Sequence, residues 1–372
     1  AEDVKWYPEW GKDRLQSMVV ERADWCISRQ RKWGVPIPVV YCKECGKEII
    51  DDGIMQKVSD IFGEEGSDAW FAHDAEYFLP EGFECPHCHK ANGFEKETDI
   101  MDVWFDSGSS HAAVLKNRNY LKWPADVYLE GADQYRGWFQ SSLLTSVAAG
   151  NRAPYEQIIT HGWTVDGEGR KMSKSLGNGI APQEIIDKYG ADILRLWVAS
   201  ADYHADIRIS PEILKQISDN YRKIRNTARY CLGNLYDFDP DKDMVANDEL
   251  EELDKYALMK LDEVIKTARA GYDEYEYHTT AHALHNFCVV DMSNFYFDVL
   301  KNRLYTTAPD SKSRRAAQTV LYKVLDALTL VLTPILAFTC DEIWNTIASK
   351  NTNILLGYTK ENAETAKTMK EN

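Results

Sequence analysis

Long hydrophobic runs and an excess of positive charge are both missing from this 372-residue sequence. It contains no run of about 18 apolar residues, the length that a membrane-spanning helix needs, so we expect no membrane partner. The 43 lysines and arginines are outnumbered by 59 aspartates and glutamates, which gives a formal net charge of −16. This balance argues against binding of nucleic acid through overall charge, but it leaves room for a local basic groove.

A secretion signal is also missing. The first residues, Ala1-Glu2-Asp3-Val4, supply neither a basic segment nor an apolar one. They also lack an initiator methionine, so the expectation from the sequence is a processed product or an excised fragment.

The chain is not dense in cysteine. The eight cysteines comprise two Cys-x-x-Cys pairs and four scattered residues. Folds stapled by disulfides are usually small and dense in cysteine, so the sequence favours a reduced, cytoplasmic protein.

Apolar and aromatic residues are plentiful. Hydrophobic residues make up 44% of the chain, with 11 tryptophans and 20 tyrosines, which excludes wholesale disorder. At roughly 100–200 residues per domain, the length predicts two or three domains.

The middle of the chain has an α/β pattern. Val127-Tyr128-Leu129 and Ile158-Ile159-Thr160 are typical of short buried strands, and each is soon followed by glycine. Residues 138–149 between them have helical composition. Alternation of strand, loop and helix predicts a parallel sheet with crossover helices.

Residues 210–350 are expected to form an all-α helical bundle. Ser210-Pro211 is a favourable helix start, with serine at the N-cap and proline at the first helical position. Pro334 should end or kink the last long helix. Apolar residues follow helical spacing over 213–228, 250–265, 277–288 and 320–332, whereas Phe295 and Val299 fit it less strictly.

The two cysteine pairs predict a structural zinc site. Two thiolates separated by two residues can bind one tetrahedral metal ion, and two such pairs complete its coordination. The expected ligands are Cys42, Cys45, Cys85 and Cys88. The 39 residues between the pairs must fold as an insertion, and Gly46 suits the tight turn after the first pair. Free thiols are the alternative interpretation, and His87 and His89 are alternative ligands.

A glycine-flanked segment over 167–178 carries three cations and two hydroxyls within six residues. Ammonium groups and serine hydroxyls suit a polyphosphate, whose charge must be neutralised as it transfers. The segment is not a Walker A loop, because the required Gly-Lys-Ser/Thr spacing is absent. A solvated basic loop is the alternative for such a composition.

The segment Lys171-Met172-Ser173-Lys174-Ser175 resembles the KMSKS loop of class I aminoacyl-tRNA synthetases, and residues 167–178 are called the KMSKS loop from here on. Residues 24–38 resemble the isoleucyl/valyl branch of that family, and residues 102–108 and 129–139 resemble the isoleucyl branch specifically. The resemblance extends over nearly the whole chain, including the helical part.

The resemblance implies ligation of isoleucine to its tRNA through an isoleucyl-adenylate made from ATP, with magnesium in the complete enzyme. It places Lys174, supported by Lys171, on the ATP phosphates, where negative charge grows. The residues that it assigns to ATP and adenylate are Glu130, Gly131, Asp133, Gln134, His161 and Lys174. Trp104 and Trp138 match tryptophans near the isoleucine pocket, with plain core packing as the alternative.

The same resemblance implies a domain organisation. A partial Rossmann-like catalytic domain is expected at 1–40 and 101–185, with the zinc-bearing insertion at 41–100. A helical anticodon-binding domain would follow at 186–350, and a polar tail at 351–372.

Some family features are missing or changed. None of the nine histidines lies in a His-x-Gly-His motif, so the first half of the Rossmann-like domain is expected to be absent, together with the editing insertion and a C-terminal zinc-bearing region. The isolated chain is therefore expected to be inactive or nearly so. Ala132, Tyr135 and Trp163 stand where the family usually has serine, histidine and phenylalanine.

The expected partner of the helical domain is isoleucine tRNA. One helix carries a basic face that would meet tRNA phosphate, formed by Arg222, Lys223, Arg225 and Arg229. A solvated charged face is the alternative for this pattern. A second hypothesis for the whole chain is a non-enzymatic, zinc-containing tRNA-binding module derived from a synthetase.

Overall fold

The computed structural model describes residues 2–347. The chain divides into two compact units, the first ending at Thr160 and the second beginning at His161. The polar tail expected at 351–372 lies outside the described residues, as do residues 348–350 of the expected helical domain.

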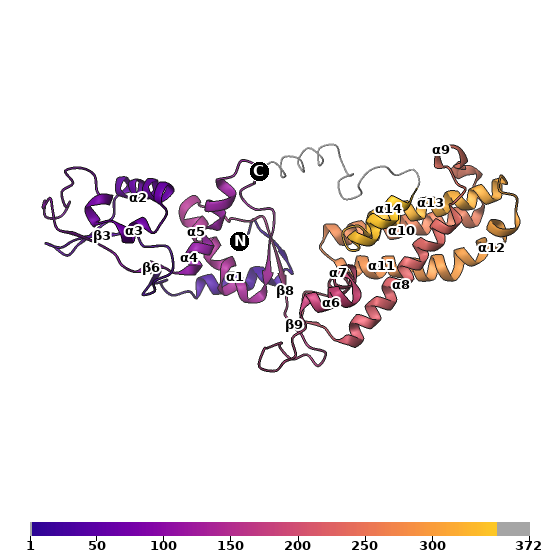
Figure 1. Cartoon of the computed structure of the whole chain (residues 1–372), viewed down its shortest axis with the longest axis horizontal. Helices are drawn as coiled ribbons and strands as arrows, with labels where there is room; N and C mark the ends of the chain where they lie inside the picture. Colours follow the sequence, from indigo (N-terminus) through magenta and orange to yellow (C-terminus); the bar gives the residue numbers. More distant parts are fainter. Residues whose placement is uncertain (1, 348–372) are drawn as a thin grey trace. The chain divides into compact units, whose positions relative to one another are not determined.

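The first unit is built on a three-stranded sheet in the order β1 (Lys5–Tyr7), β8 (Gln157–His161), β7 (Tyr128–Gly131). β1 runs parallel to β8, with Trp6 opposite Ile158. Helix α5 (Trp138–Gly150) connects β7 to β8, as parallel strands require. The expected parallel α/β architecture is confirmed. Figure 1 labels α5 and β8 in this unit. β1 is a strand that the sequence pattern did not reveal.

The core of this sheet is aromatic. Its buried residues are Val4, Trp6, Leu15, Tyr128, Tyr135, Phe139, Tyr155 and Ile158. The remaining elements around it are α1 (Trp10–Val20), β2 (Ser28–Arg29), β6 (Ile100–Met101), α4 (Val103–Gly108), η2 (His111–Lys116) and η3 (Ala132–Arg136).

Residues 41–100 form a lobe with its own small core. Its elements are β3 (Val40–Cys42), β4 (Glu48–Ile49), α2 (Asp52–Glu65), α3 (Ala69–Ala72), η1 (Ala75–Phe78) and β5 (Phe94–Lys96). β3 pairs antiparallel with both β4 and β5. Asp51 starts α2 by accepting hydrogen bonds from the backbone N–H groups of Gly53 and Ile54. Trp70 is fully buried, and its indole N–H donates to the carbonyl of Glu97.

The second unit is mainly helical and contains the predicted helices. Its elements are β9 (Thr164–Val165), α6 (Pro182–Tyr189), α7 (Ala191–Ser200), β10 (Ile207–Arg208), α8 (Pro211–Asn234), α9 (Pro240–Asp243), η4 (Asn247–Glu249), α10 (Glu252–Asp273), α11 (Tyr277–Asn286), η5 (Phe287–Tyr296), α12 (Phe297–Thr306), α13 (Lys312–Leu332) and α14 (Ala337–Thr346). Ser210 caps α8 through its hydroxyl, and α13 ends at Leu332, just before Pro334. Both predicted helix boundaries are confirmed.

The looser apolar spacing near Phe295 and Val299 has a structural cause. Residues 287–296 form a π-helical stretch, η5, in one continuous run with α11 and α12. A π-helical turn holds more residues than an α-helical turn, so it shifts the phase of the apolar stripe. Phe295 and Val299 accordingly remain 41% and 38% exposed.

The boundary between the two compact units, at residues 160 and 161, lies before residue 185, where the catalytic domain was expected to end. β9 and β10 pair in parallel, and Ile185 of α6 lies in the same apolar core as α8 and α10. The KMSKS loop, which follows β9, therefore belongs to the compact unit that holds the helices.

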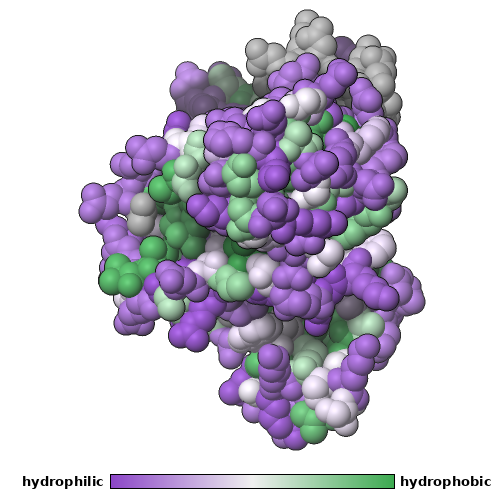
Figure 2. Space-filling view, turned by 90° about the vertical axis from the view of Figure 1, so that its left-hand side faces the viewer, coloured by the Kyte–Doolittle hydropathy of each residue, from purple (hydrophilic) through white to green (hydrophobic). Residues whose placement is uncertain are grey.

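On the face drawn in Figure 2, hydrophilic residues predominate and hydrophobic residues form separate small patches. Within residues 2–347, no helix is both long and apolar enough to cross a membrane.

Candidate functional site

The four cysteines of the two Cys-x-x-Cys pairs come together in the lobe of residues 41–100. Their sulfur atoms all lie within 4.8 Å of one another. The sulfurs of Cys42 and Cys88 are 3.6 Å apart, and those of Cys45 and Cys85 are 3.8 Å apart. Tetrahedral zinc with Zn–S bonds of about 2.3 Å requires sulfurs separated by about 3.8 Å. The donor set and its spacing therefore fit a zinc ion.

Both pairs have the same backbone turn. The residue after the second cysteine has a positive φ in each, Gly46 at 69° and His89 at 59°. This conformation suits glycine and is uncommon for histidine. It folds the chain back so that backbone N–H groups face the sulfurs, and the N–H of His87 donates to the Cys85 sulfur at 3.4 Å. Burial opposes ionisation, but the backbone N–H groups of His87 and Cys88 lower the pKa of Cys85 to about 6.

The two nearby histidines are not part of the cluster. His87 and His89 are both exposed, and the His87 Nε2 lies 3.3 Å from the carbonyl oxygen of Glu48. Among residues 2–347, the group with metal-binding geometry contains cysteines alone.

In the first unit, Trp104 and Gln134 meet beside Gly137. A Cβ at Gly137 would lie 2.6 Å from the Gln134 Oε1 and 2.9 Å from the Trp104 ring, so only glycine permits this approach. The Gln134 Oε1 also accepts a hydrogen bond from the backbone N–H of Trp138. Trp104, Gln134 and Trp138, three of the predicted site residues, are thus gathered at the start of α5.

The two tryptophans have different environments. Trp138 is half-buried, stacks on Tyr128 at 4.0 Å and donates its indole N–H to the carbonyl of Ser107. Trp104 is 42% exposed. Trp138 therefore also serves the core, whereas the face of Trp104 is open to a ligand.

Glu130, Gly131 and Asp133 lie at the carboxyl end of β7. Both carboxylates are exposed, and Asp133 accepts a hydrogen bond from the Gln134 amide at 3.1 Å. In open parallel sheets, ligands bind outside the carboxyl ends of the strands. The position of these residues is compatible with hydrogen bonding to ribose hydroxyls.

Tyr135, which stands where the family usually has histidine, is a core residue in this chain. It is fully buried, and its hydroxyl lies 2.7 Å from the Thr160 hydroxyl. Burial raises the pKa of Tyr135. Such a buried, neutral phenol supports packing in this unit.

The sequence interpretation missed Asp102. This carboxylate is 5% exposed and accepts hydrogen bonds from the Trp25 indole at 3.0 Å and from Arg29 at 2.6 Å. It also accepts from the backbone N–H of Trp104 and so caps α4. Although burial opposes it, the hydrogen bonds from Trp25 and Trp104 lower the pKa of Asp102. Asp102 joins two of the stretches that carry the family resemblance and orients the helix that bears Trp104.

The KMSKS loop begins as a hairpin in the second unit. Lys171 pairs with Val165 of β9 in an antiparallel bridge. The ammonium group of Lys171 lies over the ring of Trp163, 4.3 Å from its centroid. Lys174 is exposed, and within the described residues it forms no salt bridge. Lys171 and Lys174 therefore both lie exposed on one loop, and the ammonium group of Lys171 contacts the Trp163 ring.

Asp166 and Asn178 were also missed, and they join the two ends of the loop. The Asn178 amide donates to the Asp166 carboxylate at 2.9 Å, and its oxygen accepts from the backbone N–H of Ser173 at 2.9 Å. Aspartate directly after a strand and before a Gly-x-Gly turn is the local signal that would have identified Asp166.

The predicted nucleotide residues fall in both compact units. Glu130, Gly131, Asp133 and Gln134 belong to the first unit, with Trp104 and Trp138. His161, Lys171 and Lys174 belong to the second. The ring of His161, at the end of β8, bonds to the carbonyl oxygen of Gly162 at 2.7 Å.

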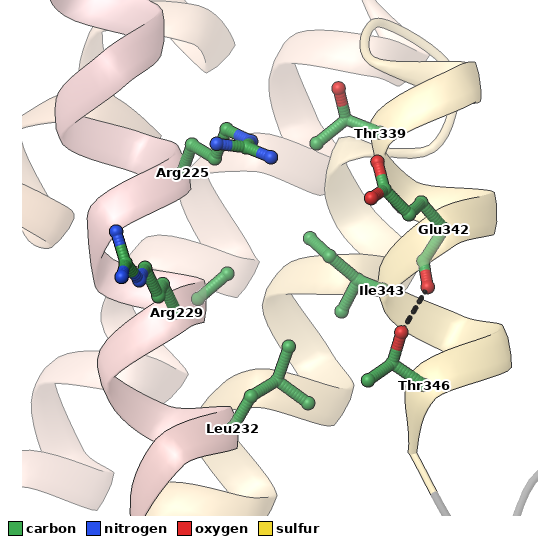
Figure 3. A pocket seen from close by; sticks show the side chains of 8 residues that line it. Arg225, Arg229, Leu232, Thr339, Glu342, Ile343 and Thr346 are labelled. Atoms are coloured by element: carbon green, nitrogen blue, oxygen red, sulfur yellow. Dashed lines mark hydrogen bonds between the residues drawn. The ribbon is translucent and has the colours of Figure 1, made fainter.

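The predicted basic residues of α8 do not share one face. Arg225 and Arg229 line a pocket of about 400 Å³ against α14, where Thr339 and Glu342 face them (Figure 3). Lys223 instead lines a separate pocket beside η5 and α12. Positions 223 and 225 differ by about 200° around a helix, which explains the separation.

Two known protein families match this chain. The family described as tRNA synthetases class I (I, L, M and V) matches residues 1–210, more than half of the chain. The chain belongs to the class I tRNA synthetases. A second family, the anticodon-binding domain of tRNA ligase, matches residues 254–372 of this synthetase chain. The resemblance drawn from the sequence motifs is confirmed.

The curated relatives of this synthetase chain carry the name isoleucine–tRNA ligase. The protein of Caldanaerobacter subterraneus is 61% identical over 342 residues, which cover 92% of this chain and 36% of that protein. The protein of Caldicellulosiruptor bescii is 60% identical over 350 residues, covering 94% of this chain and 38% of that protein. The chain thus spans somewhat more than a third of the length of these relatives.

Solved structures show the same fold at low identity. The LeuRS–tRNA–LeuAMS ternary complex of Agrobacterium radiobacter has a TM-score of 0.64 and 22% identity, covering 89% of this chain and 41% of that one. The methionyl-tRNA synthetase of Mycobacterium tuberculosis in complex with methionyl-adenylate has a TM-score of 0.65 and 18% identity, covering 98% and 61%. The Rossmann-like synthetase fold followed by helices is therefore established for this chain.

Proposed function

We propose that this chain is a part of an isoleucine–tRNA ligase, which activates isoleucine with ATP to isoleucyl-adenylate and transfers the isoleucyl group to isoleucine tRNA. The observation that carries the proposal is an identity of about 60% to proteins named isoleucine–tRNA ligase over 92–94% of the chain. The four family members I, L, M and V share the fold, so identity to one branch is what favours isoleucine.

The residues of the second unit serve the phosphates in this proposal. Lys171 and Lys174 neutralise the charge that develops as the isoleucine carboxylate attacks the α-phosphate and pyrophosphate leaves. Magnesium would share this task in the complete enzyme. The exposure of both ammonium groups on one loop supports the assignment, and His161 would face the adenosine.

The residues of the first unit serve the adenylate. Glu130 and Asp133 would accept hydrogen bonds from ribose hydroxyls beside Gly131, which leaves room for the nucleotide. Gln134 would contact the aminoacyl group, and Trp104 and Trp138 would border the isoleucine side chain. The meeting of Trp104 and Gln134 beside Gly137 supports a common pocket.

Zinc is the metal that we assign to the cysteine cluster. Four thiolates complete a tetrahedral shell and leave no position for water or substrate, so the ion is structural and takes no part in the reaction. The helical unit would bind isoleucine tRNA on its anticodon side. Unpaired anticodon bases and local cations would provide the contacts.

Isoleucine-dependent ATP–pyrophosphate exchange tests the activity. We expect none from this chain alone, because its 372 residues contain no His-x-Gly-His motif. In a full-length version, Lys174→Ala should lower kcat by about 100-fold or more, because the transition state loses a charge partner. Lys266→Ala, an exposed lysine paired with Asp262 on α10, is the matched control and should leave exchange unchanged.

Three outcomes would overturn parts of this proposal. Exchange by the chain alone would refute its inactivity. Activation of valine in preference to isoleucine by the full-length version would refute the specificity. Equal activity of the Lys174 and Lys266 variants would remove Lys174 from the phosphate site.

A further inference from the structure

We propose that Asn178 and Asp166 form a latch that holds residues 171–177 in one conformation and thereby positions Lys171 and Lys174 for the phosphates of a nucleoside triphosphate. The phosphate part of this inference rests on the proposed function, whereas the latch itself rests only on the contacts of the loop.

Asn178 uses both ends of its side-chain amide. The Nδ2 donates to the Asp166 carboxylate at 2.9 Å and to the carbonyl of Lys171 at 3.3 Å. The Oδ1 accepts from the backbone N–H of Ser173 at 2.9 Å. One side chain thus ties the end of the loop to its beginning and to the backbone on both sides of Met172.

Asp166 is the fixed end of the latch. It follows β9 directly, is 8% exposed, and accepts from the backbone N–H groups of Glu168 and Arg170 at 3.0 Å and 2.8 Å. The Arg170 side chain also donates to it at 2.9 Å. The hydrogen bond from Asn178 and those from Arg170 hold the pKa of Asp166 well below its usual range. The carboxylate therefore stays ionised at neutral pH and remains an acceptor.

Within the latch, residues 173–177 form a single turn. The backbone N–H of Gly177 donates to the carbonyl of Ser173, and the N–H of Leu176 donates to the Ser173 hydroxyl. Gly177 has a φ of +62°, which reverses the chain toward Asn178. Lys174 lies in this turn, so a change at Asn178 reaches its backbone through Ser173.

Lys171 is held more firmly than Lys174. Its backbone pairs with Val165, its carbonyl accepts from Asn178, and its ammonium lies over Trp163. A loop that is ordered before the ligand arrives avoids part of the entropy cost of binding. The latch would therefore act on affinity for polyphosphate without touching the ligand, and Asn178 and Asp166 are positioning residues.

Hydrogen–deuterium exchange of the full chain tests the latch. Asn178→Ala should speed exchange of the amides of residues 171–177 by about tenfold, which corresponds to the loss of hydrogen bonds to a charged group. Peptides from α8 and α10 should be unchanged. Gln183→Ala is the matched control, because it removes an exposed amide that bonds Asp187 outside the loop. Unchanged exchange of residues 171–177 in Asn178→Ala would overturn the latch.

A second variant tests whether the Asn178–Asp166 contact itself holds the loop, as opposed to any substitution at residue 178 increasing its mobility. Asn178→Asp keeps an acceptor for Ser173 but places a second carboxylate against Asp166. Two carboxylates in contact share a proton as the pH falls, so the exchange ratio to the unsubstituted chain should be large at pH 7.5 and approach one near pH 5. A ratio that does not change with pH would contradict the proposed contact.

Binding of inorganic tripolyphosphate, measured by calorimetry, tests the consequence. We expect Asn178→Ala to weaken it about five- to tenfold and Lys171→Ala/Lys174→Ala to abolish it. Faster exchange with unaltered tripolyphosphate affinity would overturn the positioning role. If the unsubstituted chain binds no tripolyphosphate, the proposed phosphate function fails, while faster exchange in Asn178→Ala still supports the latch.

Discussion

Asp254 is the most completely buried carboxylate of the helical unit and carries a dense set of hydrogen bonds. It is 0% exposed and receives both terminal nitrogens of Arg303 at 2.8 Å. The Tyr296 hydroxyl donates to the same carboxylate at 2.5 Å. The pair links the start of α10 to α12, and such a pair is costly to break because the remaining charge stays buried.

Substitution of Asp254 should destabilise the helical unit strongly. Asp254→Ala removes the buried carboxylate that accepts from both terminal nitrogens of Arg303 and from the Tyr296 hydroxyl, at a cost of about 3–5 kcal/mol. Arg303 keeps its hydrogen bonds to Ser313, which do not neutralise its charge. For a unit of this size we expect the unfolding transition to fall by roughly 10 °C. Differential scanning calorimetry measures the shift.

The matched control lies on the same helix. Glu252→Ala removes an exposed carboxylate, 3.6 Å from Lys255, and should change stability by less than about 0.5 kcal/mol. If the two variants melt at the same temperature, the buried pair contributes no more than a surface pair.

At the scale of elements, the lobe of residues 41–100 combines very short strands with the four-cysteine cluster that we assign to zinc. Its two antiparallel pairings involve at most three residues per strand. Its core contains the buried residues Val40, Cys42, Ile49, Ile54, Val58, Trp70, Ala75, Phe78, Leu79, Cys85 and Phe94. Cys42 and Cys85, two of the proposed metal ligands, therefore belong to the core itself, so metal binding and folding of the lobe should be coupled.

Metal removal should unfold this lobe. We expect about one zinc ion per chain, lost after Cys85→Ser or prolonged chelation, and faster hydrogen exchange over residues 41–100. Affinity should also fall as the pH is lowered, because protons compete with the metal for the thiolates. Metal analysis combined with hydrogen exchange measures both effects.

Cys26 provides the control for this experiment, because it is exposed and lies outside the cluster. Cys26→Ser should retain zinc and the exchange pattern. A zinc-free protein with four titratable thiols and an intact lobe would mean that the cluster is no metal site.

At the scale of the whole chain, the acidic net charge bears on the tRNA binding that we propose. The net charge is −16, yet Arg225 and Arg229 lie side by side along α8 and form no salt bridge within the described residues (Figure 3). Phosphate binding depends on such local cations, because each neutralised phosphate releases counterions. The overall charge therefore sets a background repulsion that salt will screen.

Removal of Arg225 and Arg229 should lower the affinity for tRNA and also make that affinity less dependent on salt concentration. If each contacts one phosphate, Arg225→Ala/Arg229→Ala should lower the slope of log affinity against log salt by about 1.5. Filter binding of isoleucine tRNA over a series of salt concentrations measures the slope.

Two paired lysines of α10 offer a control with the same loss of charge. Lys255→Ala/Lys266→Ala removes cations that already face Glu252 and Asp262. An equal loss of slope in both double variants would show that the effect comes from overall charge, and would remove the arginines from the interface.

The spacing of residues in the sequence was sufficient to predict those features that depend on residues close together along the chain. Helix α8 begins where Ser210 and Pro211 predict, because capping involves residues three apart. The cysteine pairs predict their cluster because two intervening residues set the bite of each pair. The lysines of the KMSKS loop were found by their contiguous motif.

Contacts between distant residues could not be predicted in this way. Asp102 bonds Trp25 and Arg29, which lie more than 70 positions earlier, and β1 pairs with β8 from the other end of the unit. Even Asp166 and Asn178, only 12 positions apart, meet because the loop reverses at Gly177. A pattern of residue types along the sequence does not show which of these residues come into contact in the fold.

Composition and motif were thus enough to identify the α/β and helical parts, the clustering of the four cysteines and the synthetase family. Only the tertiary structure showed that Lys223 and Arg225 face different pockets, that Tyr135 is a core residue and that Asn178 closes the KMSKS loop. The physical reason is that helix signals and metal-binding pairs depend on short-range geometry, whereas burial and side-chain hydrogen bonds depend on which segments the fold brings together.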